Sequence, residues 1–102
     1  MRLVIIDQEE NKMQVGIDGV FYHDLDGSQL PENVHAVQWY GESGEVEYQD
    51  PVTRKITSNE DITDITSFQF AVTAWQAAYD AEQAEIAAAQ AAYEASQQAQ
   101  PE

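Results

Sequence analysis

The carboxyl-terminal third of the chain constrains the fold most, because it reads as one uninterrupted helix. Between Ala71 and Ala99 the sequence is rich in alanine, the strongest helix former, and it contains neither glycine nor proline. A helix from Ser67 to Gln98 would be about 48 Å long at roughly 1.5 Å per residue. A domain built from the preceding residues, about 65 of them, would have a radius of gyration of only about 11 Å. The helix is therefore predicted to extend well beyond the part of the chain on which it packs.

An apolar stripe runs along the first turns of this helix. Its members recur at spacings of four, three and four residues, and they are Phe68, Val72, Trp75 and Tyr79. This spacing is typical of an amphipathic helix, and we expect these side chains to close the open face of a sheet. Beyond Tyr79 the stripe continues through Ile86 and Tyr93 alone, seven residues apart. Residues 81–98 are expected to project, and binding in a partner's groove, association with a second copy and fraying all remain open.

Residues 1–65 carry the alternation and the turn signals of an antiparallel sheet. Asp18-Gly19 is a two-residue hairpin signal, residues 24–33 read as a turn, and Asp50-Pro51 is predicted to end a strand. The predicted strands are 2–6, 13–17, 20–23, 34–40, 45–49 and a short edge strand at 54–57. In the fifth of these, Val46 and Tyr48 are expected on one face and the polar residues on the other, namely Glu45, Glu47 and Gln49.

Residues 58–67 are predicted to lead from the sheet into the helix. Asn59, Glu60, Asp61 and Asp64 supply caps and first-turn acids, and Thr66 or Ser67 is the predicted N-cap. The sequence thus predicts an α+β protein with an antiparallel sheet of about five or six strands and one long helix. Its parts are a β domain over 1–65, an alanine-rich helix over 66–98 and a frayed tail over 99–102.

The charge of the chain excludes several classes of partner. Nineteen acids stand against four bases, for a net charge of −15, and no lysine or arginine follows Lys55. Such a chain repels phosphate and anionic lipid, so direct nucleic-acid or membrane binding is not expected. Two interpretations stay open: a solvated acidic surface, or acids that mimic a nucleic acid and dock on a basic protein.

No pattern in the sequence indicates catalysis, a cofactor or a metal. Asp24 begins a run that resembles a calcium loop, but Gln29 and His35 stand where the loop needs glycine and glutamate. The two histidines, His23 and His35, lack metal-ligand spacing, and the chain has no cysteine. Its serines lie in predicted turns, caps or the helix tail, outside any nucleophile motif. A non-enzymatic protein is expected.

Aromatic side chains on free surfaces are the candidates for partner binding. Trp39 and Tyr40 are adjacent on a strand, so Tyr40 should share the outer face with Gln38 if Trp39 faces the core. Aromatic residues carry much of the binding energy at protein interfaces. The predicted partner-binding residues are Tyr22, Tyr40, Tyr79, Ile86 and Tyr93.

The segment from Val34 to Tyr48 resembles one found in small accessory proteins of tailed bacteriophages. In those proteins a His-Ala-x-Gln-Trp block, here beginning at His35, precedes Gly-x-x-Glu-Tyr, here beginning at Gly44, and then a helix with a tryptophan, here Trp75. In size and layout they resemble tail-fibre assembly chaperones, which bind the end of a fibre protein and help it to fold or trimerise. The alanine- and glutamine-rich segment after Ala81 is not part of this pattern.

The resemblance implies a protein-binding role in phage assembly. The implied partner is a tail-fibre or other tail protein, with a homo-oligomer through the C-terminal helix as a further possibility. The implied location is the cytoplasm of the infected bacterium, with or without retention in the virion tail. The alternative function is an acidic inhibitor or nucleic-acid mimic that blocks a basic groove on a host protein.

Overall fold

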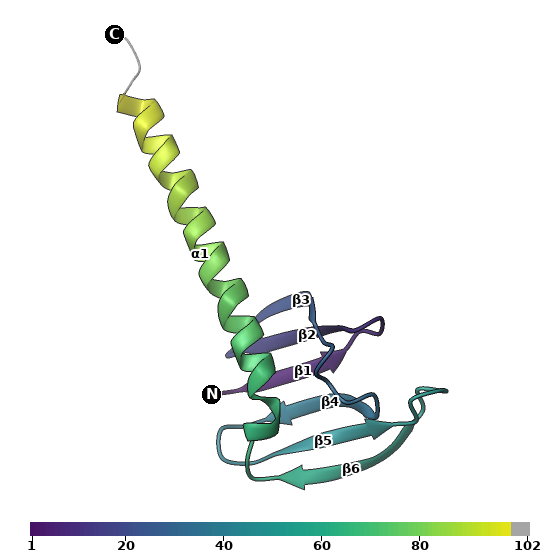
Figure 1. Cartoon of the computed structure of the whole chain (residues 1–102). Coiled ribbons are helices and arrows are strands. Elements are labelled where there is room, and N and C mark those ends of the chain that lie inside the picture. The colour runs from purple at the N-terminus through teal and green to yellow at the C-terminus, as the bar shows by residue number, and fades with distance from the viewer. Residues whose placement is uncertain (99–102) are drawn as a thin grey trace.

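The structure is a computed structural model, and it describes residues 1–98 (Figure 1). It contains a six-stranded antiparallel sheet followed by a short 3₁₀ turn and one long helix, which confirms the predicted α+β class. The strands are β1 (Leu3–Asp7), β2 (Lys12–Ile17), β3 (Val20–Asp26), β4 (Val34–Trp39), β5 (Gly44–Gln49) and β6 (Ile56–Ile62). The helical elements are η1 (Thr66–Phe68) and α1 (Gln69–Gln98). The tail predicted at 99–102 lies outside the described residues.

The sheet has the strand order β3-β2-β1-β4-β5-β6, with the first strand near its middle. The β1 strand pairs with β2 on one side and with β4 on the other, which suits its run of apolar and mostly β-branched residues. The hairpin between β2 and β3 turns at Asp18 and Gly19, whose φ angles are 50° and 88°. Positive φ at both turn residues is the requirement of the tight hairpin that this dipeptide predicts.

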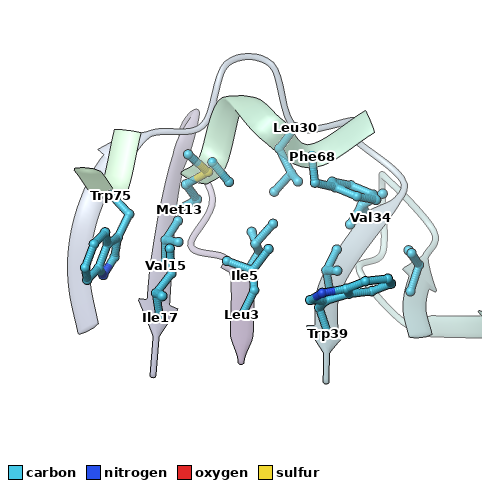
Figure 2. Close-up of a cluster of buried hydrophobic side chains, with 13 residues drawn as sticks. Leu3, Ile5, Met13, Val15, Ile17, Leu30, Val34, Trp39, Phe68 and Trp75 are labelled. Atoms are coloured by element: carbon cyan, nitrogen blue, oxygen red, sulfur yellow. The ribbon is translucent and has the colours of Figure 1, made fainter. Parts of the chain in front are cut away.

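One face of the sheet carries the core (Figure 2), and α1 covers this face only with its first turns (Figure 1). Alternate residues of the strands point inward, as the period of two requires. The helix adds Ala71 and Trp75, and η1 adds Phe68. The buried core residues are Leu3, Ile5, Met13, Val15, Ile17, Leu30, Val34, Val37, Trp39, Val46, Phe68, Ala71 and Trp75. Of the predicted covering residues, Phe68 and Trp75 are buried, while Val72 is half-buried.

Gln49, predicted to lie with Glu45 and Glu47 on the polar face of β5, is only 2% exposed and is therefore buried instead of facing solvent. Register shifts occur in β4 between Val34 and Ala36, and between Tyr48 and Gln49 where β5 pairs with β6. In both shifts the extra residue belongs to the neighbouring strand, His35 in β4 and Thr57 in β6, so the alternation of β5 itself is not interrupted. His35 contacts both Gln49 and Glu47, and the burial of Gln49 depends on such contacts with other segments, which the sequence of β5 alone does not show.

Strand pairing also changes three predicted boundaries. The β3 strand continues to Asp26 instead of ending at His23, because Asp26 pairs with Lys12 of β2. The edge strand β6 occupies 56–62, so Asn59 to Asp61 are in a strand and do not cap the helix. Pairing with β5 supplies their backbone hydrogen bonds and overrides the poor strand propensity of these residues. The predicted N-cap at Thr66 or Ser67 was also wrong, because both residues lie within η1, whose N-cap is Ile65 and has no side-chain cap hydrogen bond.

The helix leaves the sheet after about three turns and projects from it (Figure 1). Trp75 fixes the departure point, since its Nε1–H donates to the Val20 carbonyl at 2.8 Å. From Asp80 to Gln98 every residue is exposed, and the long axis of the molecule reaches 67 Å. The predicted projecting segment is confirmed in these described residues. Within residues 1–98, no helix is both long and apolar enough to cross a membrane.

Candidate protein-binding site

The base of the projecting helix is held to the sheet by a cluster of aromatic rings. Trp75 stacks on Tyr79, with ring centroids 5.0 Å apart and an interplanar angle of 12°. Tyr22 on β3 meets the Trp75 ring edge-on at a centroid distance of 5.9 Å. Two predicted partner-binding residues, Tyr22 and Tyr79, are thus brought together by Trp75. Both contribute to the attachment of the helix, and Tyr79 also begins the exposed stripe.

Tyr22 is a packing residue rather than part of a free surface. Its hydroxyl is buried and has no hydrogen-bond partner among residues 1–98. Burial raises the pKa of this hydroxyl, and the carboxylate of Glu82 on the helix raises it further. No hydrogen bond joins Tyr22 to Glu82 at the positions described. The sequence could not place Tyr22 here, because its burial depends on where the helix crosses β3.

The other predicted residues of the helix lie on its free part. Ile86 is 51% exposed and Tyr93 is 65% exposed. They follow Tyr79 at intervals of seven residues, so all three lie on one side of the helix. The exposed stripe is defined as Tyr79, Ile86 and Tyr93. Beyond Tyr79, its side chains do not belong to the core formed by residues 1–98.

Glutamines with the same spacing were missed in the prediction of the site. Each member of the exposed stripe is followed four residues later by a glutamine, at Gln83, Gln90 and Gln97. Residues four apart are neighbours on a helix, so the glutamines lie beside the stripe on the same face. Alanines occupy the opposite side at a matching interval, at Ala81, Ala88 and Ala95. The seven-residue spacing of the glutamines was the signal that could have identified them.

Tyr40 lies on the other face of the sheet, apart from the helix. Its ring is 58% exposed and its centroid is 4.3 Å from the Arg2 guanidinium carbon. Its hydroxyl donates to Gln38 Oε1 at 3.1 Å, and Arg2 Nη2 donates to the same oxygen at 2.8 Å. The expected pairing of Tyr40 with Gln38 on the outer face is confirmed. The structure does not join Tyr40 to the exposed stripe.

The outer face also carries a group of acids near its β6 edge. Glu45 is directly opposite Asp61 in the register of β5 and β6, so the two carboxylates point to the same face. Glu47 is two residues further along β5, and its contact with His35 is long, at 3.6 Å. In the described chain no lysine or arginine forms a salt bridge with any of these acids. Like charges placed opposite each other destabilise a sheet slightly.

A polar cluster at the end of the sheet has a structural explanation. Arg54 bridges Asp7 at 2.7 Å and Glu9 at 2.6 Å, and the Gln49 amide donates to Asp7 at 2.9 Å. Burial would raise the pKa of Asp7, but the Glu9 N–H, Gln49 and Arg54 together hold it below its ordinary value. The adjoining cavity of about 230 Å³ includes Arg54 in its lining. Because two carboxylates already neutralise that guanidinium, the cavity is not built for an anion.

The two histidines are in separate surroundings. His23 contacts Asp24 at 3.0 Å on an exposed part of β3, while His35 Nδ1 lies 3.2 Å from the Gln49 oxygen. Among residues 1–98, no three side chains of the metal-binding types come together to hold an ion. Comparison with family models, with curated proteins and with solved structures found no match to this chain.

Proposed function

We propose that this chain is a non-enzymatic protein-binding module that acts as a tail-fibre assembly chaperone or tail accessory protein of a bacteriophage. The observation that supports a binding role is the exposed stripe on a helix that projects beyond its own core. The phage role is supported by the resemblance of Val34 to Tyr48 to small tail accessory proteins. The partner would be a fibre or other tail protein.

The arrangement suits a binding role because the stripe is formed before the partner arrives. Alanine gives the helix intrinsic stability, so little ordering of the backbone accompanies binding. Full burial of a large exposed apolar side chain yields about 1.5–3 kcal/mol, and Ile86 and Tyr93, which are already partly covered, together offer about as much as one such side chain. The sheet holds the helix through Trp75 and leaves Ile86 and Tyr93 free.

Co-production with a tail-fibre protein tests the chaperone role. The readout is the yield of soluble fibre trimer, with the chain and without it. The double variant Ile86→Glu with Tyr93→Glu should lose the increase in trimer that the unmodified chain gives. Its matched control carries the same two added acids on the opposite side of the helix, as Ala88→Glu with Ala95→Glu, and should retain the increase. Equal trimer yield with and without the unmodified chain would contradict the proposal.

The acids on the outer face support a second candidate, an inhibitor that blocks a basic groove. Glu45 and Asp61 are placed side by side against their mutual repulsion, as a mimic of spaced phosphates would require. Such binding weakens steeply with salt. The variant Glu45→Gln with Asp61→Asn should then abolish binding to a basic nucleic-acid-binding protein. If the chain binds no such protein at low salt, this candidate fails.

A further inference from the structure

The exposed stripe repeats with a period of seven residues rather than the 3.6-residue period of a straight helix. The repeat appears twice, once in the large residues Tyr79, Ile86 and Tyr93 and again in the glutamines that follow each of them by four. Spacings of three and four in alternation form the seam of a coiled coil, in which two helices wind around each other. A strict seven-residue repeat keeps such a seam facing a partner helix along its whole length.

Acids border this seam on both sides, and no base accompanies them. Asp80 and Glu94 directly follow stripe residues on one flank, while Glu82 directly precedes Gln83 on the other flank and Glu85 lies further from the seam on that same side. The chain has no lysine or arginine after Lys55 and no histidine after His35. Charges at the flanking positions of a coiled coil select the partner, because like charges repel and opposite charges attract. The borders of this seam therefore favour a partner with basic flanks.

A second copy of the chain fits the seam poorly in a parallel orientation. Ile86 follows Trp75 by eleven residues and Tyr79 by seven, so it points within about 20° of the direction of both. Trp75 and Tyr79 pack toward the sheet, and the seam therefore continues the sheet-facing side of the helix. In a parallel pair, the first turns of one helix would run into the sheet that belongs to the other.

An antiparallel pair avoids the sheets but brings acids together. The exposed segments would overlap from end to end, which places Glu94 of each copy beside the turn that contains Asp80, Glu82 and Glu85 of the other. With no base in either segment, both ends of the pair would carry unrelieved repulsion. The structure thus disfavours both orientations of a homodimer through this seam.

We propose that the exposed stripe and its glutamines bind an α-helix of a partner protein whose apolar seam is flanked by lysine and arginine. This inference rests on the proposed protein-binding function and adds the chemistry of the partner. The partner helix lies along residues 79–97, inserts apolar side chains between the stripe residues and places its bases beside the four acids.

A synthetic helical peptide of about four heptads serves as the probe, with leucine at the two seam positions and lysine at the two flanking positions. A second peptide with glutamate in place of lysine is the control probe. Binding to the full chain is measured by isothermal titration calorimetry at about 0.05 M and about 0.5 M salt. The lysine peptide should bind, with an affinity that falls several-fold at the higher salt, and the glutamate peptide should not bind.

Two matched variants separate the contribution of the apolar seam to peptide binding from the contribution of charge. Ile86→Glu adds an acid within the seam, whereas Ala88→Glu adds the same acid on the opposite side of the helix. We expect the first to weaken binding of the lysine peptide about tenfold, and the second to change it by less than about threefold. Equal or tighter binding by Ile86→Glu would show that charge alone holds the peptide, and would overturn the proposal.

Two further results would overturn it. One is no binding of the lysine peptide at low salt. The other is self-association of the chain in light scattering that Ile86→Glu abolishes and Ala88→Glu preserves, which would identify a second copy as the occupant. Either result leaves the chaperone role to be judged by the yield of fibre trimer, because the chain could hold a fibre through the sheet. Loss of that yield effect together with binding of the lysine peptide would instead refute the chaperone role alone.

Discussion

Replacement of Gln49 by leucine tests whether the buried polar cluster stabilises the fold. Leucine fills nearly the same volume but cannot donate, so the hydrogen bonds to Asp7 at 2.9 Å and to the Glu32 carbonyl at 3.2 Å are lost. A hydrogen bond to a charged group contributes about 1.5–3 kcal/mol and one to a neutral carbonyl about 1 kcal/mol. Since the added apolar contact offsets part of this loss, the expected decrease in the free energy of unfolding is about 3 kcal/mol.

Urea unfolding followed by tryptophan fluorescence measures this decrease, because Trp39 and Trp75 are both buried in the core. With an m-value of about 1.5 kcal/mol/M, the midpoint should fall by about 2 M and the m-value should stay unchanged. Gln29→Leu, on an exposed turn, is the control and should change the free energy by less than about 0.5 kcal/mol. If Gln49→Leu and Gln29→Leu have the same midpoint, the hydrogen bonds of Gln49 do not stabilise the fold as reasoned.

Three further predictions concern the cluster, the anchor of the helix and the exposed stripe. The pKa of Asp7 is lowered from its ordinary 3.8, so its carboxylate contributes stability above pH 3.8 that is lost as the pH falls through the lower folded value. Asp7→Asn should remove this acid-labile part, and urea midpoints of both proteins measured between about pH 7 and 2 should converge toward the acid end. Trp75→Phe keeps an aromatic ring but loses the bond to the Val20 carbonyl, and thermal unfolding by circular dichroism should show a loss of about 1–2 kcal/mol. Ile86→Glu should leave the melting temperature within about 2 °C of the unmodified chain, and a larger drop would mean that Ile86 packs on the sheet.

The parts of the fold that depend on local pattern could be predicted from the sequence. Alternation along 13–17 and 34–40, the turn at Asp18-Gly19 and the stripe from Phe68 to Tyr79 each report on a neighbourhood of a few residues. The parts that depend on pairing between distant segments could not. The burial of Gln49 depends on contacts with Asp7, Glu32 and His35 from other segments, and the strand at 56–62 forms although residues 58–61 are of types that are uncommon in strands.

The candidate site also has some features that could be predicted from the sequence and others that could not. Exposure of Ile86 and Tyr93 could be predicted, since it follows from the length of the helix and the small size of the sheet. The burial of Tyr22 could not be predicted, since it depends on the crossing of the helix over β3. The separation of Tyr40 from the helix likewise depends on which face the helix covers.

The attachment of the helix at Trp75 has a mechanical consequence. From Trp75 to Gln98 the helix extends about 35 Å at roughly 1.5 Å per residue, and nothing in the described chain supports it on the way. The helix is therefore a rigid rod that can pivot only where it is attached, at the stacked rings of Trp75 and Tyr79. A tilt of about 10° at this attachment, small enough for packed rings to accommodate, displaces the tip by about 6 Å. The tip can thus sweep an area wider than the helix itself while the sheet stays still, which enlarges the region over which a first encounter succeeds.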